Sequence, residues 1–550
     1  MKKILIVNLT RFGDLLQTSP TIAGLKAQHP DAAITVVVDR NFADVARGLP
    51  GVDRVWPLDL NELGRTMIGG TGADLRRAYH WAEEQIGALR AEGFDLAVNY
   101  SSSKMSAVLL KMIGAPDTRG WTMAANGYRM IAHRWSQLFA ASALTRRQAP
   151  FNLVDYYKRA AGVQGGPERL FYRVAPEARA RAAAILADAG VTDETPVVAL
   201  QLGASRAVRV WPVESFVALG RELEARIGAR LLLCGGGGDR PLADLVAPGL
   251  GGAAIDVCGR TSVEELGALL ERSCILVTSD TGPMHMAVAV GTPVVSLFFG
   301  PALPFDTGPY GRDHLCLHAE VPCAPCDHHI TCLQPFCRET LAPGAVAEAV
   351  IARRAGDWAA LAMASDRWPE IRWYRTGFDA EGLFDVTRIG LRPPTWRETL
   401  RRAVRAVWKA TLDGTRPERP RTTLPREAAV LRNLVPLARA ATVEAAAVET
   451  IARERGEIER LTAAARALEE RDFELFRFGA IHEPAALILQ MFRFEKENVG
   501  GEDVVAIATA TRILHEALEV QIALLIDLLD PPPTRPDTAE RGDDDHAHLA

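Results

Sequence analysis

The sequence predicts an α/β protein of two successive doubly wound halves, followed by an α-rich region. Short, almost entirely apolar runs alternate with helical patterns over residues 3–114 and again over residues 197–299. This alternation is typical of parallel sheets whose helices cover both faces. Beyond about residue 365 the strand pattern gives way to long helical patterns.

The first half opens with KILIVNL at residues 3–9, an apolar run typical of a strand buried on both faces. A polar turn and a helical pattern at 15–27 follow, which completes a βα unit. Further strands are predicted at 34–39, 54–58 and 95–100, and further helices at 42–49, 73–92 and 104–114.

The second half repeats the alternation after a linker at about 165–195. Strands are predicted at 197–202, 230–235, 253–258, 274–280 and 293–299, with helices at 213–228, after Asp239, and at 263–273. Ligands of such sheets bind beyond the carboxyl ends of the strands. We therefore expect an N-terminal domain at 1–165 and a second domain at 190–350, with a cleft between them.

The C-terminal region is predicted to be an α-rich extension over residues 366–530. It opens with a Trp-rich stretch that could form a hairpin, and helices are predicted at about 395–412, 426–448, 450–475, 484–497 and 501–529. Residues 531–550 combine a run of prolines with a run of aspartates and are predicted to be disordered.

The composition is that of a globular protein, with 48% hydrophobic and 24% charged residues in 550. A net charge of −5 gives no overall electrostatic reason to bind nucleic acid. The apolar run at the N-terminus is too short for an export signal, and no uncharged apolar stretch reaches the roughly 18 residues of a spanning helix. We therefore expect a cytoplasmic protein, or one peripheral to the inner membrane.

The turn after the first strand, TRFGDLLQTSP, lacks the G-x-G-x-x-G pattern and so argues against a dinucleotide-dependent dehydrogenase. Gly13 permits a tight turn, and Asp14 would project a carboxylate into the cleft. That carboxylate could accept a proton from a substrate hydroxyl. The alternative is that Asp14 only caps the helix.

Two further loops favour an anionic ligand. The loop GASRAVRVWP offers Ser205, Arg206 and Arg209, whose donors suit phosphate, although solvated surface arginines are the alternative. The loop SDTGPMH leads from an apolar strand into a helix, and a helix N-terminus attracts anions. Asp280 could hold a sugar hydroxyl, and His285 could reach the same ligand or be a structural histidine.

Taken together, these loops resemble glycosyltransferase family nine, the ADP-heptose-dependent heptosyltransferases of lipopolysaccharide core assembly. The similarity extends over about residues 1–350, and is carried by KILIVNLTRFGDLLQTSP, FDLAVNYSSSKMSAVLLKMIGAPDTRGW, GASRAVRVWP and SDTGPMHMAVAVGTPVVSLFFGP. The resemblance implies a glycosyltransferase-B fold of two Rossmann-like domains, with the nucleotide sugar on the second.

The resemblance also implies roles for individual residues. Asp14 matches the catalytic base, Ser205 and Arg209 match the phosphate contacts, and the other donor-binding matches are Asp280, Thr281, Gly282 and His285. Arg206, in the same loop as Ser205 and Arg209, is also predicted to bind the donor. The family usually has Lys where this chain has Arg209. Arginine keeps the positive charge, but its planar guanidinium donates two parallel hydrogen bonds where the lysine ammonium acts as a point charge. No divalent ion is implied for catalysis.

Four cysteines lie close together in the pattern C-x2-C-x5-C-x4-C, at Cys323, Cys326, Cys332 and Cys337. Such thiols suit a tetrahedral structural Zn or Fe site, since disulfides are not expected in a reducing compartment. His328 and His329 lie inside the cluster. The alternative is a set of reduced thiols that bind no metal.

The helix at 395–412 is predicted to be basic and amphipathic, with Trp396, Leu400 and Val404 along one face and arginines beside it. It is a candidate for peripheral contact with an anionic membrane. The alternative is that the apolar stripe packs on the protein.

The function predicted from these observations is inverting transfer of a heptose, or a similar sugar, from an ADP-sugar to a lipopolysaccharide-core or other glycan or lipid-linked acceptor. Three alternatives stay open: a heptosyltransferase acting on autotransporter-type proteins, a nucleotide-sugar epimerase on the same fold, and a glycan-binding scaffold without turnover. The epimerase would act on the nucleotide sugar alone, without an acceptor.

Overall fold

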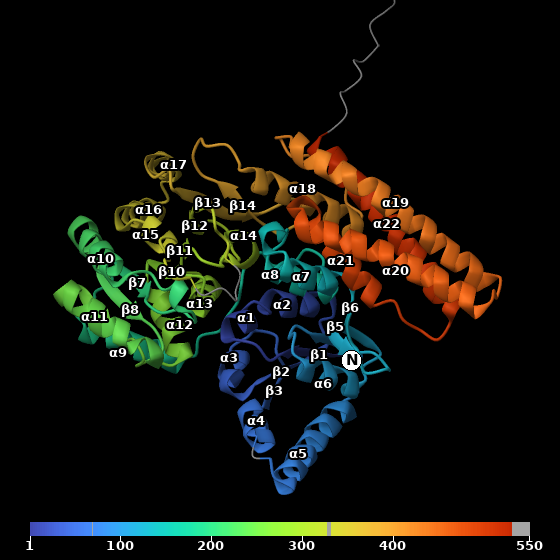
Figure 1. Cartoon of the computed structure of the whole chain (residues 1–550). Coiled ribbons are helices and arrows are strands. Elements are labelled where there is room, and N and C mark those ends of the chain that lie inside the picture. The colour runs from blue at the N-terminus through green and yellow to red at the C-terminus, as the bar shows by residue number, and fades with distance from the viewer. Residues whose placement is uncertain (69, 327–331, 531–550) are drawn as a thin grey trace, which may run out of the picture. The chain divides into compact units, whose positions relative to one another are not determined.

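A computed structural model describes residues 1–68, 70–326 and 332–530 (Figure 1). The chain forms two compact units, which are considered separately: residues 1–393 with 494–498, and the C-terminal residues 394–493 with 499–530. The predicted disordered tail, 531–550, lies outside the described residues.

The first sheet has the strand order β3-β2-β1-β4-β5-β6 and is parallel except for the β5–β6 pair. Its strands are β1 (Lys3–Asn8), β2 (Ala33–Asp39), β3 (Arg54–Leu58), β4 (Leu96–Asn99), β5 (Asp117–Met123) and β6 (Arg129–Ala132). The strand β1 is central, which is why the side chains from Ile4 to Val7 are completely buried.

The helices of this half are α1 (Phe12–Leu16), α2 (Ser19–Gln28), α3 (Ala43–Arg47), α4 (Leu60–Ile68), α5 (Gly72–Ala91), α6 (Lys104–Ile113), α7 (Arg134–Leu144) and α8 (Leu153–Ala160). The helix predicted at 15–27 is two helices, with Pro20 in the first turn of the second. Proline is favoured there because its missing N–H would have no partner. The helix α4 and the hairpin β5–β6 were not predicted.

The second sheet has the order β14-β13-β12-β11-β10-β7-β8-β9. Its strands are β7 (Val197–Gln201), β8 (Arg230–Cys234), β9 (Ala254–Asp256), β10 (Ile275–Ser279), β11 (Val294–Phe298), β12 (Leu315–Ala319), β13 (Ile371–Phe378) and β14 (Phe384–Arg388). The accompanying α-helices are α9 (Pro176–Asp188), α10 (Val213–Ile227), α11 (Arg240–Leu250), α12 (Val263–Arg272), α13 (Gly282–Val290), α14 (Pro304–Thr307), α15 (Cys337–Thr340), α16 (Pro343–Ala355) and α17 (Trp358–Arg367).

The boundary predicted at residue 366 is corrected by this sheet. The Trp-rich stretch does form a hairpin, β13–β14, but β13 pairs antiparallel with β12 from Leu315 to Ala319. The short strand β12 leaves an open sheet edge, and the hairpin satisfies its backbone groups. The helical unit therefore begins at residue 394, not at 366.

The C-terminal unit is helical, with α18 (Trp396–Asp413), α19 (Pro425–Arg453), α20 (Ile458–Ile481) and α22 (Val504–Leu529). The helix α21 (Ala486–Glu497) ends in the first unit. On α18, Leu400 and Val404 are buried and Trp396 is 38% exposed. This burial favours packing of the apolar stripe on the protein over membrane contact.

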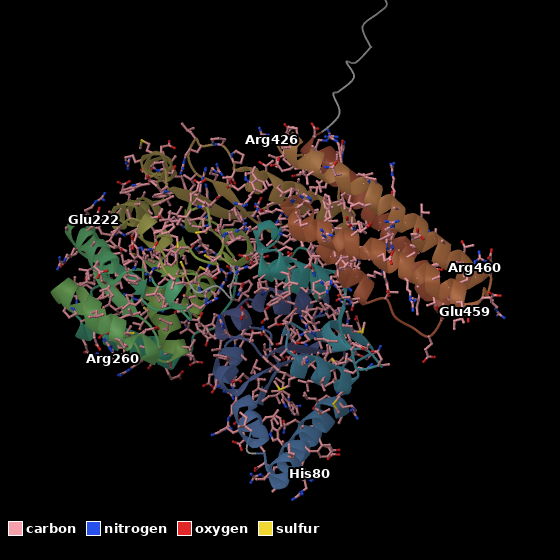
Figure 2. All side chains as sticks on the ribbon, viewed as in Figure 1. His80, Glu222, Arg260, Arg426, Glu459 and Arg460 are labelled. Carbon is pink, nitrogen blue, oxygen red and sulfur yellow. The ribbon has the colours of Figure 1, made fainter. Side chains whose placement is uncertain are left out.

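Several titratable side chains lie exposed on the surface. Figure 2 shows His80, Arg260 and Glu459, all of which are exposed. No helix in the described part of the chain is both long enough and apolar enough to span a bilayer.

Candidate active site

A cavity of about 960 Å³ lies at the carboxyl ends of the strands of both sheets. Its wall contains all the catalytic and donor-binding residues predicted from the sequence: Asp14, Ser205, Arg206, Arg209, Asp280, Thr281, Gly282 and His285. The loops after β7 and β10 share one edge of the second sheet, and the turn after β1, from the first sheet, meets them at the cavity.

Asp14 lies in α1, in the turn that follows β1. The side-chain amide of Asn8 donates to the main-chain oxygen of Asp14 at 3.3 Å, and the Arg11 N–H donates to its carboxylate at 3.4 Å. Burial raises the pKa of the Asp14 carboxyl, while the N–H and the guanidinium of Arg11 act in the opposite direction. A carboxylate with a raised pKa is a better proton acceptor, and its bond to Arg11 shows that it also caps the helix.

Two glycines allow the Asp14 turn to approach the start of α13. A Cβ on Gly282 would lie 2.2 Å from the ring of Phe12, and a Cβ on Gly13 would lie 3.0 Å from the Gly282 Cα. Neither position has room for a side chain. The pair thereby holds the Asp14 turn against the loop that follows β10.

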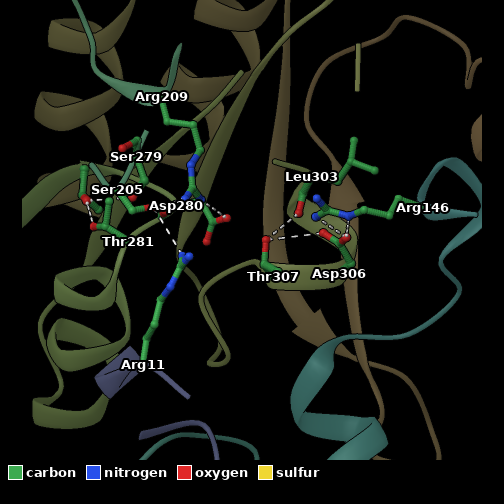
Figure 3. A network of polar contacts seen from close by, with 11 residues as sticks. Arg11, Arg146, Ser205, Arg209, Ser279, Asp280, Thr281, Leu303, Asp306 and Thr307 are labelled. Atoms are coloured by element: carbon green, nitrogen blue, oxygen red, sulfur yellow. Dashed lines mark hydrogen bonds and ion pairs between the residues drawn. The ribbon is translucent and has the colours of Figure 1, made fainter. Parts of the chain in front are cut away.

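Arg209 joins the two loops of the second half (Figure 3). Its Nη1 donates to the main-chain oxygen and to Oδ2 of Asp280 at 3.0 and 3.1 Å, and its Nη2 donates to Ser205 Oγ at 2.5 Å. Arg11 Nη1, from the first half, donates to the same Ser205 Oγ at 3.3 Å. Two guanidinium groups therefore converge on one hydroxyl, a suitable arrangement for a phosphate group.

The helix α13 begins at the cavity. Thr281 precedes it in an extended conformation, and Thr281 makes no side-chain cap to the first turn. His285 is 4% exposed, and burial lowers the pKa of its imidazole to about 4, so that it is neutral at pH 7. Its Nδ1 has no hydrogen-bond partner in the described part of the chain. A helix N-terminus and a neutral imidazole thus face the same space.

Sequence reasoning missed a second ion pair on the cavity wall. Arg146 donates to Asp306 Oδ2 from Nη2 at 2.6 Å and from Nε at 3.0 Å (Figure 3), and the side chains are 16% and 12% exposed. Burial raises the pKa of Asp306, and Arg146 opposes this shift. Neither residue lies in a motif, and they are 160 positions apart, so no local signal could have revealed the pair.

The four clustered cysteines are free, without disulfides, and differ in exposure. Cys323 is exposed, Cys326 and Cys332 are half-buried, and Cys337 is buried. Burial raises the pKa of the Cys326 thiol, and the charges of the other three thiolates raise it further. Within residues 1–68, 70–326 and 332–530, no group of three or more candidate ligands is arranged to hold a metal. His328 and His329, which lie within the cysteine cluster in the sequence, are outside the described residues.

Comparisons with known proteins match one family model and several curated heptosyltransferases. Residues 85–336 match the model of glycosyltransferase family 9 (heptosyltransferase). Lipopolysaccharide heptosyltransferase 1 of Pseudomonas aeruginosa is 26% identical over 60% of this chain and 88% of its own length. Lipopolysaccharide heptosyltransferase 3 of Escherichia coli is 26% identical over 52% of this chain and 79% of its own. The structure of E. coli ADP-heptose LPS heptosyltransferase II aligns at 18% identity with a TM-score of 0.48, covering 65% of this chain and 99% of that one.

Proposed function

Residues 85–336 are a glycosyltransferase family 9 domain, and we propose that this glycosyltransferase transfers a heptose from ADP-heptose to a lipopolysaccharide-core or similar glycan acceptor. The names of the relatives support the heptose and the lipopolysaccharide acceptor. The site of action would be the cytoplasmic side of the inner membrane.

One observation carries the proposal: a half-buried carboxylate and a cationic loop line the same cavity. Asp14 comes from the first half, while Ser205, Arg209 and the start of α13 come from the second. This arrangement separates the group that can accept a proton from the groups that can hold negative charge. Glycosyl transfer requires both, on opposite sides of the anomeric carbon.

In the proposed reaction, Asp14 accepts the proton of the acceptor hydroxyl as the oxygen attacks the anomeric carbon. The bond between that carbon and the diphosphate oxygen breaks, and its electron pair leaves with the ADP, which inverts the configuration. Arg209 and Ser205 donate to the leaving diphosphate, on which negative charge grows. Because fixed cations supply this stabilisation, the reaction needs no divalent metal.

We also propose that the cysteine cluster holds one structural Zn or Fe ion through Cys323, Cys326, Cys332 and Cys337. The four thiols lie within fifteen residues, and burial, together with the charges of neighbouring thiolates, raises the pKa of Cys326 and of Cys337. A bound cation would favour ionisation of these thiols, because metals bind the thiolate form. Such an ion would stabilise the fold and take no part in transfer.

The proposed donor is tested by titrating the purified protein with ADP-, UDP- and GDP-sugars in a calorimeter. Binding of ADP-heptose in preference to the other two nucleotide classes is expected. Preference for UDP or GDP would contradict the heptose assignment. Incubation with donor alone separates the alternatives, since an epimerase would convert the free nucleotide sugar and a scaffold would bind it without turnover.

A further inference from the structure

The helix α6 (Lys104–Ile113) has two apolar faces, of which only one is covered by protein. Its inner face packs into the core of the first half through Leu109, Leu110 and Ile113. Its outer face exposes Met105, Val108 and Met112 at 40%, 41% and 43%. No other helix in the described part of the chain exposes three large apolar side chains within eight residues.

The remaining exposed side chains of α6 are basic. Lys104 and Lys111 are both exposed, one at each end of the row formed by Met105, Val108 and Met112. At spacings of three and four residues, Met105, Val108 and Met112 share one face of the helix, and Lys104 and Lys111 lie along one edge of that face. The solvent-facing side of a surface helix normally carries acidic, basic and neutral polar side chains. This face of α6 carries neither an acidic nor a neutral polar side chain.

The two lysines are free to meet a negative partner. No ion pair joins either of them to another residue that the structure describes. Asp117, which opens the adjacent strand β5, is already paired with Arg119 at 2.6 Å. Nearby, Arg129 is exposed and donates to the main-chain oxygen of Ser102 at 3.1 Å, so that it adds a further cation before α6 begins.

This face begins close to the proposed catalytic turn. The strand β4, which leads into α6, pairs with β1, and the Leu9 N–H donates to Ser101 Oγ at 2.7 Å. Lys104 therefore lies at the same sheet edge as the Asp14 turn. From there, the ten residues of α6 extend for about 15 Å.

We propose that this outer face of α6 is an interaction surface for an anionic lipid bilayer. Methionine and valine would enter the boundary between headgroups and acyl chains, while the two lysines would contact lipid phosphates. The proposal deepens the proposed function, on which its biological meaning rests, because a lipid-anchored acceptor would meet the protein beside Asp14. It also locates membrane contact on α6, not on the helix at 396–413.

The test is co-sedimentation of the full chain with phosphatidylcholine vesicles, prepared with and without phosphatidylglycerol. The wild type is expected to bind the anionic vesicles more tightly, and to release them as salt is raised. Each lysine near the surface contributes about fivefold, so the double variant K104A/K111A should bind roughly 20- to 30-fold more weakly. The triple variant M105S/V108S/M112S should also lose binding, while retaining both charges.

The matched control is Leu245→Ser on α11, which removes a 63% exposed apolar side chain far from this face and should bind as the wild type does. Calorimetry with ADP monitors folding and the donor site independently of lipid. Equal binding to neutral and anionic vesicles, or an unaffected lysine variant, would overturn the proposal. Self-association that both α6 variants abolish, without vesicle binding, would assign the face to a second copy instead. Vesicle binding without ADP binding would contradict only the proposed function.

Discussion

Replacing Arg209 with alanine tests how the cavity holds a diphosphate. The change removes hydrogen bonds to Ser205 Oγ and to two oxygens of Asp280, and leaves the Asp280 carboxylate without this cation. The two side chains of the pair are only 11% and 12% exposed, so water replaces little of what is lost.

The expected loss of affinity follows from the charged hydrogen bond that Arg209 would make to the diphosphate. A hydrogen bond involving a charged group contributes about 1.5–3 kcal/mol, which corresponds to roughly a 10- to 150-fold weaker affinity for ADP or ADP-sugar. Transfer should slow as well, because negative charge on the diphosphate increases as the bond breaks. Arg209→Lys keeps the charge without the planar fork and should fall between the wild type and alanine.

The assay is calorimetric titration with ADP, together with thermal unfolding. Arg272→Ala is the matched control, because its ion pair with Asp193 is largely exposed, with side chains 53% and 93% accessible. Exposed pairs contribute little, so ADP affinity and melting temperature should stay near those of the wild type. Unchanged ADP affinity in Arg209→Ala would refute the assignment of this loop to phosphate.

Three further predictions concern His285, Gly282 and the cysteine cluster. Burial lowers the pKa of His285 to about 4 in the folded protein, so the unfolded chain takes up a proton at higher pH than the folded chain does. The free energy of unfolding should therefore fall as pH drops from about 6.5 to 4. His285→Gln should reduce this pH dependence in thermal melts across the same range. Gly282→Ala should lower ADP affinity and melting temperature because its Cβ would collide with the neighbouring ring, whereas Gly87→Ala, with open space around it, should not destabilise the protein. Elemental analysis should find about one Zn or Fe per chain. Cys323→Ser or Cys337→Ser should lower the melting temperature and leave ADP affinity nearly unchanged. Metal-free protein of unchanged stability would contradict the metal site.

The sequence was informative wherever function lies at the end of a buried parallel strand. Runs such as KILIVNL indicate buried parallel strands, and ligands bind beyond the carboxyl ends of such strands. Asp14, Arg209 and Asp280 each follow a predicted strand in one of the two halves, so the sequence predicts that all three face the cleft between the halves. The cavity contains all three. What each of them does in catalysis stays a prediction.

The partners of these side chains could not be predicted. Arg209 contacts Asp280 across 71 positions, and Arg146 contacts Asp306 across 160, and no periodicity links residues so far apart. The strand β12 was missed because it is short and contains a histidine, His318, within LCLHA. Without β12, the following hairpin had no sheet to join, which explains the misplaced boundary at residue 366.

The central claim is that Asp14 removes the acceptor proton in the same cavity that holds the nucleotide sugar. Its most direct test is Asp14→Asn, which preserves size and nearly all contacts but cannot accept the proton. Transfer measured with saturating donor should fall by about 10²- to 10⁴-fold, while calorimetry shows ADP affinity close to that of the wild type. Wild-type turnover in this variant would contradict the account.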